Sequence, residues 1–272
     1  MFECVINISE GRDATSLHEL ASAASSSLRD VHADPYHHRA VFTLIDPPGP
    51  LVAHAHALIG AAYRLLDLNG HEGVHPRFGV VDVVPFVALD PARAGEALTL
   101  RDDLARWLAE TYRVPVFLYG ALGDGTTRSL PDVRRGAFTS LAPDFGPATA
   151  PPSLGAVAVG ARTVLVAWNL WLRDTSLDEA RVIARSLRRP ALRTLAFELG
   201  DRVQVSCNIV DTAALAPSQV YDEVAAMLTG GAIERCELVG LVPASLLERE
   251  DPARWAQLGL SAEATIEART AP

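Results

Sequence analysis

The order of the elements expected between residues 162 and 242 restricts the fold of this chain more than any other feature. Four apolar runs predict strands, at residues 162–172, 192–199, 202–210 and 235–242. One helix is expected at 176–187, where Ser176 and Glu179 form a capping box, and another at 217–228, before two glycines. This order of strand, helix, strand, strand, helix and strand is that of a ferredoxin-like domain.

The first half of the chain also alternates apolar strands with amphipathic helices. Strands are expected at residues 2–6, 40–45, 80–87 and 114–119, and helices at 17–28, 51–68 and 90–112. Residues 30–39 are expected to form a solvated turn around Pro35, and the Pro- and Gly-rich residues 142–155 an ordered loop between the halves. We therefore predict an α/β protein of two subdomains, residues 1–160 and residues 161–272.

Charge and apolar content exclude several classes of partner. The formal net charge of −9 at pH 7 argues against nucleic acid. No run approaches the roughly 18 consecutive apolar residues of a membrane span, and the amino terminus lacks the pattern of a signal peptide. We therefore expect a cytoplasmic protein without a membrane partner. The three cysteines, Cys4, Cys207 and Cys236, lie far apart in apolar segments and are expected in the core.

The basic residues and the histidines restrict the chemistry. All 24 basic residues are arginine, so a Schiff-base lysine and a P-loop are both excluded. All eight histidines lie between His18 and His75, so imidazole chemistry must come from the first quarter of the chain. A metal site from His32, Asp34 and either His37 or His38 has no characteristic spacing to support it.

Residues 71–75 match the HExxH pattern of zinc metalloproteases, in which two histidines one helical turn apart bind the metal. Here Gly73 lies inside the expected turn and Pro76 follows His75 directly, so a helix cannot continue through the motif. No histidine follows His75 to serve as a third ligand. A zinc hydrolase using His71, Glu72 and His75 is therefore a minor alternative, and no metal is expected.

Several segments, taken in order, resemble the formiminotransferase domain of glutamate formimidoyltransferase. They are residues 4–12, 30–43, 75–77, 82–86, 114–120, 143–147, 155–169, 204–211 and 237–243. The resemblance implies two α/β subdomains of ferredoxin-like type with a ligand tunnel or cleft between them, and a homodimer. It also implies that the histidine of the His-Pro-Arg motif, His75, is the catalytic base.

The resemblance implies a folate-dependent one-carbon transfer, in which a formimino group moves from N-formimino-L-glutamate to N5 of tetrahydrofolate during histidine degradation. Tetrahydrofolate is then a co-substrate. Imidazole, with a reference pKa of about 6.5, can take the N5 proton and return one to the leaving nitrogen, and such general acid–base catalysis contributes roughly a hundred- to ten-thousandfold.

Candidate binding residues follow from the same segments. The loop that contacts folate in the family corresponds to Gly146, Pro147, Ser153 and Gly155. Arginine binds carboxylates bidentately, which favours Arg39, Arg77 and Arg162 as contacts for the carboxylates of the reactants. Either Asp34 or Asp82 can orient His75 or hold the cationic amidine, and the sequence does not choose between them. The remaining polar candidates are Asn7, His38, Asn169, Gln204 and Asn208.

Two positions depart from the family pattern. Val74 and Ala121 stand where the family usually has glutamate. Two alternatives therefore stay open: a relative with a different one-carbon donor or amine substrate, and a folate- or pterin-binding protein without transferase activity.

Overall fold

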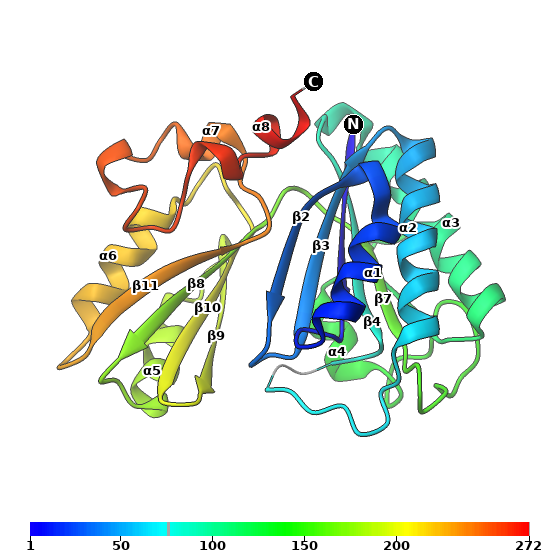
Figure 1. The fold of residues 1–272 in the computed structure, drawn as a ribbon, viewed down its shortest axis with the longest axis horizontal. Coiled ribbons are helices and arrows are strands. Elements are labelled where there is room, and N and C mark those ends of the chain that lie inside the picture. Colours follow the sequence, from blue (N-terminus) through cyan, green and yellow to red (C-terminus); the bar gives the residue numbers. More distant parts are fainter. Residues whose placement is uncertain (75–76, 272) are drawn as a thin grey trace. The chain divides into compact units, whose positions relative to one another are not determined.

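The computed structural model describes residues 1–74 and 77–271, which form two compact units, Met1–Thr163 and Val164–Pro272 (Figure 1). Unit 1 is built on a seven-stranded sheet of order β2-β3-β1-β4-β7-β5-β6. Its strands are β1 (Phe2–Ile8), β2 (Leu28–Asp34), β3 (Arg39–Asp46), β4 (Val81–Ala88), β5 (Val116–Ala121), β6 (Thr127–Arg128) and β7 (Val157–Ala161). Strand β1 is antiparallel to both β3 and β4, whereas β4, β7 and β5 run parallel.

The helices of unit 1 cover the two faces of this sheet unequally. They are α1 (Ala14–Ala24), α2 (Pro48–Leu65), α3 (Ala94–Tyr112) and α4 (Leu130–Gly136), with short 3-10 turns η1 (Ser25–Ser27) and η2 (Pro91–Arg93). Helices α1, α2 and α3 cover one face of the sheet (Figure 1). In β1, Cys4 and Ile6 belong to the core on that face. Because side chains alternate along a strand, Glu3 and Asn7 point to the opposite face, which α4 partly covers through Val133.

Both units contain the same motif. In unit 1, the order β1-α1-β2-β3-α2-β4 with strand positions β2-β3-β1-β4 is a ferredoxin-like arrangement, extended by β7, β5 and β6. Unit 2 consists of β8 (Val166–Arg173), α5 (Leu177–Leu187), β9 (Leu192–Leu199), β10 (Arg202–Ile209), α6 (Pro217–Met227) and β11 (Ala232–Val239), in the order β11-β8-β10-β9. Helices α7 (Ala244–Leu247) and α8 (Ile266–Thr270) and turns η3 (Pro252–Arg254) and η4 (Ala262–Ala264) follow. The predicted α/β class and ferredoxin-like character are confirmed.

Two local predictions were wrong. Residues 30–34 belong to strand β2 where we expected a turn; β2 lies at the edge of the sheet, so it lacks the apolar alternation of a buried strand. The run expected as one strand at 162–172 is two strands, because β7 ends at Ala161 and β8 begins at Val166. The polar segment after residue 120 contains helix α4. None of the helices in the described chain is long and apolar enough to span a membrane.

Candidate active site

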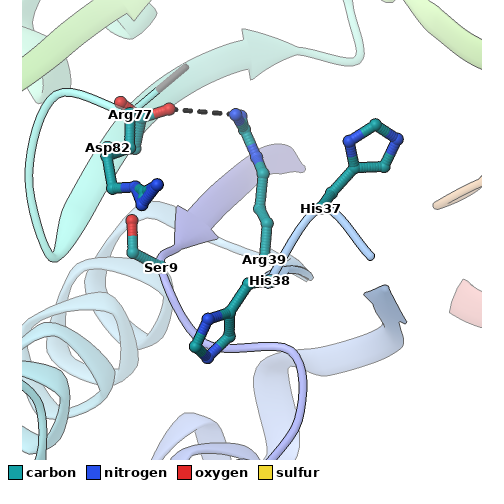
Figure 2. A pocket seen from close by; sticks show the side chains of 6 residues that line it. All are labelled: Ser9, His37, His38, Arg39, Arg77 and Asp82. Carbon is teal, nitrogen blue, oxygen red and sulfur yellow. Dashed lines mark hydrogen bonds and ion pairs between the residues drawn. The ribbon is translucent and has the colours of Figure 1, made fainter. Parts of the chain in front are cut away.

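A small pocket opens where β1 ends and where β3 and β4 begin. It is lined by Ser9, His37, His38, Arg39, Arg77 and Asp82 (Figure 2) and has an empty volume of about 180 Å³, part of which is open solvent. Ser9 is bound to the residues that precede β4. Its hydroxyl donates to the Gly79 carbonyl oxygen at 2.8 Å, and its backbone N–H donates to the Val80 carbonyl oxygen at 2.8 Å. The pocket therefore joins segments that lie up to about 70 residues apart in sequence.

Asp82 reaches this pocket because β4 is irregular at its start. Asn7 pairs with Val83, but the next residue of β1, Ile8, pairs with Val81, so Asp82 is the extra residue of a β-bulge. A bulge changes the direction of a side chain relative to the regular alternation of the strand. The bulge places the Asp82 carboxylate on the face opposite α1, α2 and α3, where Arg39 donates to both Asp82 and Asn7.

The Asp82 carboxylate is almost completely buried, with 1% of the side chain exposed, and all of its recorded partners are donors. Its Oδ1 accepts the backbone N–H of Phe78 at 2.7 Å. Its Oδ2 accepts from Arg39 Nη1 at 3.0 Å, the contact drawn in Figure 2, and from Arg134 Nη2 at 2.6 Å. Two guanidinium groups thus share one carboxylate oxygen.

Asn7 fixes the orientation of Arg39. The Asn7 Oδ1 atom accepts from Arg39 Nε at 3.1 Å and from Nη2 at 2.5 Å, while Asn7 Nδ2 donates to the carbonyl oxygens of Val5 and Val83. Burial lowers the pKa of Arg39, and the Asp82 carboxylate opposes that change. The predicted site residues Asn7, Arg39 and Asp82 therefore form one network.

Arg77 is held by the loop that precedes it. Its Nη1 donates to His71 Nδ1 at 2.6 Å and to the His71 carbonyl oxygen at 3.0 Å, and Nη2 donates to the Gly73 carbonyl oxygen at 3.1 Å. Because a guanidinium can only donate, His71 Nδ1 must be unprotonated. Burial, followed by the charges of His38 and Arg77, lowers the pKa of His71, in keeping with a neutral ring.

His38 connects this loop to the turn between β2 and β3. Its ring stacks on that of His71, with centroids 3.9 Å apart and an interplanar angle of 14°. Its Nδ1 lies 2.8 Å from the Glu72 carbonyl oxygen, and its Nε2 lies 3.3 Å from Glu10 Oε1. His38, which we predicted as a binding residue, thus supports the position of Arg77 through His71.

The catalytic residue inferred from the resemblance, His75, lies outside the described residues, as does Pro76. Residues 71–74 form no helical turn, and Arg77 donates to His71 Nδ1, so this part of the HExxH pattern lacks the helix on which zinc ligation depends. Within residues 1–74 and 77–271 no group of three His, Cys, Asp or Glu side chains could hold a metal ion.

Asp34 differs from Asp82 in its local role. Its Oδ1 accepts the backbone N–H groups of Tyr36 and His37, both at 2.8 Å, so this carboxylate stabilises the turn between β2 and β3. Its Oδ2 lies 3.9 Å from His37 Nε2. Of the two predicted acidic residues, Asp82 is the one that pairs directly with arginines, namely Arg39 and Arg134.

The carboxyl end of the predicted folate loop pairs with the segment between Arg77 and Asp82. Gly155 forms a bridge with Gly79, and the Ser153 carbonyl oxygen accepts the N–H of Leu68 at 2.9 Å. A Cβ atom on Gly155, whose φ is +72°, would lie 2.5 Å from the Phe78 carbonyl oxygen. Gly146, with φ of +85°, packs against Val114, two residues before β5, and the half-buried Pro147 follows it. Both glycines therefore have structural reasons for their identity.

The Gly155→Ala substitution is expected to destabilise the protein by about 2–5 kcal/mol, the sum of strain at a positive φ and of overlap with the backbone at Phe78 and Gly79. Gly125→Ala is the matched control, because Gly125 has φ of +84° and open space around it. It should cost only the strain, about 1–2 kcal/mol. Urea denaturation measures both, and equal costs would contradict the packing role of Gly155.

Arg162 does not join the other arginines. It follows β7, and its backbone N–H donates to the Phe86 carbonyl oxygen at 3.0 Å, near the end of the sheet where β1 begins. There its charge acts on Glu3 and Tyr119. Burial raises the pKa of Glu3, and Arg162 opposes this. Burial also raises the pKa of Tyr119 to about 12. Arg134, which binds Asp82, also acts on Tyr119, so Arg162 and the Asp82 network have Tyr119 as a common neighbour.

Glu3 and Glu10 should respond to pH in opposite directions. For Glu3, the raised pKa means that stability falls as pH rises from the ordinary carboxyl value of 4.5 toward the folded pKa. Burial alone would raise the pKa of Glu10, but the N–H groups of Arg12 and Asp13 and the charge of His38 lower it. Its stabilising contribution is therefore present above 4.5 and lost as pH falls through its lowered pKa.

We expect Glu3→Gln to raise the urea concentration at the midpoint of unfolding near pH 7, and Glu10→Gln to lower it. Both differences from wild type should shrink at about pH 3. Unfolding curves at the two pH values for both variants provide the measurement. A Glu3→Gln variant that is less stable than wild type at neutral pH would show that the carboxylate form of Glu3 is the favourable one.

The three predicted residues of unit 2 lie on one face of its sheet. Val205 and Cys207 of β10 face the helices, so Gln204 and Asn208 face the other way, as the alternation predicted. Asn169 Nδ2 lies 3.4 Å from Glu237 Oε2, which also accepts from Trp171 Nε1 at 2.9 Å. Gln204 is fully buried and Asn208 is exposed.

Sequence reasoning missed Arg134, which binds Asp82 directly. The sequence does contain a signal for helix α4, because Ser129 and Asp132 form a capping box and Pro131 occupies its first turn.

Val74 and Ala121, the two departures from the family pattern, contribute no carboxylate. Val74 is 48% exposed, and its N–H lies 3.4 Å from the Tyr36 carbonyl oxygen. The Ala121 carbonyl oxygen accepts from Arg101.

Comparison with known proteins agrees with this architecture. The model of the formiminotransferase domain, N-terminal subdomain, matches residues 1–162. Glutamate formimidoyltransferase of Thermoplasma acidophilum is 33% identical, over 91% of this chain and 89% of that protein. Its counterpart in Streptococcus pyogenes serotype M1 is 31% identical over 90% of each chain. Formimidoyltransferase-cyclodeaminase of Rattus norvegicus is 32% identical, and this chain spans 51% of its length.

The α/β architecture and these relatives define the protein as a transferase. More specifically, the chain belongs to the formiminotransferase family, because the family model covers more than half of it and the relatives align along nearly its whole length. The resemblance carried by the collinear segments is thereby confirmed.

Proposed function

We propose that this protein transfers a formimino group from N-formimino-L-glutamate to N5 of tetrahydrofolate, as a step of histidine degradation. Family membership carries the proposal, since relatives that align over about nine-tenths of this chain are named glutamate formimidoyltransferase. The pocket supports it, because two arginines, Arg39 and Arg77, line it with one carboxylate, Asp82, and the reactants carry several carboxylates.

The reaction requires one bond to form and one to break. The N5 lone pair attacks the amidine carbon, and the N5–carbon bond gives a tetrahedral adduct. A base removes the N5 proton, a proton returns to the glutamate nitrogen, and the carbon–nitrogen bond to glutamate breaks. The products are 5-formimino-tetrahydrofolate and glutamate. We assign the proton transfers to His75, by its place in the His-Pro-Arg motif.

The described residues have roles in binding and orientation within this proposal. Arg39 is held by Asn7 and Asp82 and presents a fixed positive charge at the pocket. Among the described residues Arg77 donates only to neutral acceptors, so its charge is available to a substrate carboxylate. Gly155, at the end of the proposed folate loop, pairs with Gly79, two residues after Arg77.

A coupled assay of the purified protein tests the proposal. Loss of N-formimino-L-glutamate should depend on tetrahydrofolate and yield glutamate in equal amount. N-formyl-L-glutamate in parallel tests a different one-carbon donor, which the uncharged Val74 and Ala121 favour. If the protein turns over only N-formyl-L-glutamate, that compound is the one-carbon donor and the proposed donor is wrong. Folate binding without turnover of either compound would instead identify a binding protein.

The proposal includes three further expectations. The protein is a cytoplasmic homodimer and needs no metal. Light scattering of the purified protein measures the assembly, fractionation of the source cells gives the location, and elemental measurement gives the metal content. A monomer, a membrane-associated fraction or stoichiometric zinc would each contradict the corresponding part.

A further inference from the structure

Arg134 occupies a well-supported position beside the pocket. Its helix, α4, begins at a capping box of Ser129 and Asp132, and the neighbouring Val133 is fully buried against Phe117 and Val83. This packing holds the backbone that carries Arg134. Its guanidinium is 24% exposed and donates from Nη2 to Asp82 Oδ2 at 2.6 Å. The contact therefore joins a fixed helix to a carboxylate that is 1% exposed.

The other oxygen of Asp82 binds the segment that follows the His-Pro-Arg motif. Oδ1 accepts the N–H of Phe78 at 2.7 Å. The Phe78 ring contacts the rings of Phe117 and Phe138, with centroids 5.3 and 5.9 Å apart. Its carbonyl oxygen accepts the N–H of Ala156 at 2.9 Å. Phe78 is thus fixed at its N–H, its side chain and its carbonyl group, and Asp82 supplies the first of these contacts.

Arg39 and Arg134 approach Oδ2 from β3 and from α4, so together they determine the direction of the carboxylate. Without Arg134, Asp82 would be paired with Arg39 alone and could turn toward it. The hydrogen bond to Phe78 would then lengthen, and the adjacent Arg77 would shift with its backbone. A displacement of about 1 Å in a catalytic segment can reduce the rate on the order of a hundredfold.

We propose that Arg134 is a positioning residue for the transfer reaction: through Asp82 it holds the N–H of Phe78 and thereby the segment that carries Arg77 and ends the His-Pro-Arg motif. The inference rests on the proposed function for its activity readout. Helix α4 thereby has a role in the reaction, although Arg134 is not among the residues that line the pocket.

The Arg134→Ala variant tests the proposal, with Arg135→Ala as its control. Arg135 is the next residue of α4, is 72% exposed and pairs with Asp132 of its own helix. We expect kcat to fall about ten- to a hundredfold for Arg134→Ala, with KM for either substrate changing less than about threefold. The control should match wild type. A kcat within about twofold of wild type for Arg134→Ala would overturn the proposal.

Chemical rescue separates positioning from a general loss of folding. Added guanidinium at a non-denaturing concentration can enter the space left by the partly exposed Arg134 side chain and bind Asp82. It should restore part of kcat in Arg134→Ala and leave the control unchanged. The absence of rescue in a variant whose circular dichroism matches wild type would contradict the proposed contact with Asp82.

Hydrogen–deuterium exchange makes the test independent of turnover. Peptides that contain Phe78 should exchange faster in Arg134→Ala than in wild type or Arg135→Ala, because the N–H of Phe78 loses its fixed acceptor. Unchanged exchange would overturn the inference. If wild type shows no transfer but exchange behaves as expected, the proposed function fails while the positioning contact stands.

Discussion

Replacement of His75 with alanine is expected to lower kcat for formimino transfer by about a hundred- to ten-thousandfold. An imidazole can both take the N5 proton and protonate the leaving nitrogen near neutral pH, and alanine can do neither. Because general acid–base catalysis acts on the transition state, KM for tetrahydrofolate should change little. Initial rates at saturating concentrations of both substrates measure the effect.

His18→Ala is the control for this variant, since His18 is exposed on α1. It should retain wild-type kinetics and stability. A His75→Ala enzyme with a kcat within a few-fold of wild type would show that another group performs the proton transfers. Tetrahydrofolate binding that is unchanged by the substitution, in a protein without turnover, would favour the alternative of a folate-binding protein.

The Asp82→Asn variant is expected to lose about 3–5 kcal/mol of the free energy of unfolding, the usual cost of removing one partner from a buried charge pair. An amide can still accept the N–H of Phe78 through Oδ1. Its Nδ2 group, however, would then face the donors of Arg39 and Arg134, and neither guanidinium would keep its carboxylate. Urea denaturation followed by circular dichroism gives the value.

Asp144→Asn provides the comparison for Asp82. The Asp144 carboxylate also accepts one backbone N–H, that of Leu118, and one arginine, Arg128, but its side chain is 22% exposed. We expect a cost of about 1 kcal/mol there, because water can replace part of the lost interaction. Equal costs at the two sites would mean that the second arginine and the deeper burial of Asp82 contribute nothing to stability.

The second half of the chain was predicted more completely than the first. Its capping box at Ser176 and its turn at Gly200 and Asp201 are signals within a few neighbouring residues, and both lie where the structure has a helix start and a hairpin. Strand β2 and helix α4 were missed. The edge position of β2 relaxes the apolar alternation, and α4 spans only seven residues, so neither produces a strong periodic pattern.

The sequence by itself determined the properties that depend on local backbone chemistry and on residue order. Gly73 and Pro76 were enough to argue against a helix through the HExxH motif, and residues 71–74 are not helical. The collinear segments were enough to identify the family, as the comparisons confirm. These conclusions need no knowledge of which strands are neighbours, because steric limits and motif order are properties of the chain alone.

Only the tertiary structure decided how the charges at the pocket are paired. Asp82 was a predicted site residue, but its bulge is a property of the register between β1 and β4, which no single segment encodes. Likewise Arg134 meets Asp82 across 52 residues, while Arg162, from the same predicted set as Arg39, donates its backbone N–H to the Phe86 carbonyl oxygen. Contacts between distant segments depend on strand order and packing, and these are settled only when the whole unit folds.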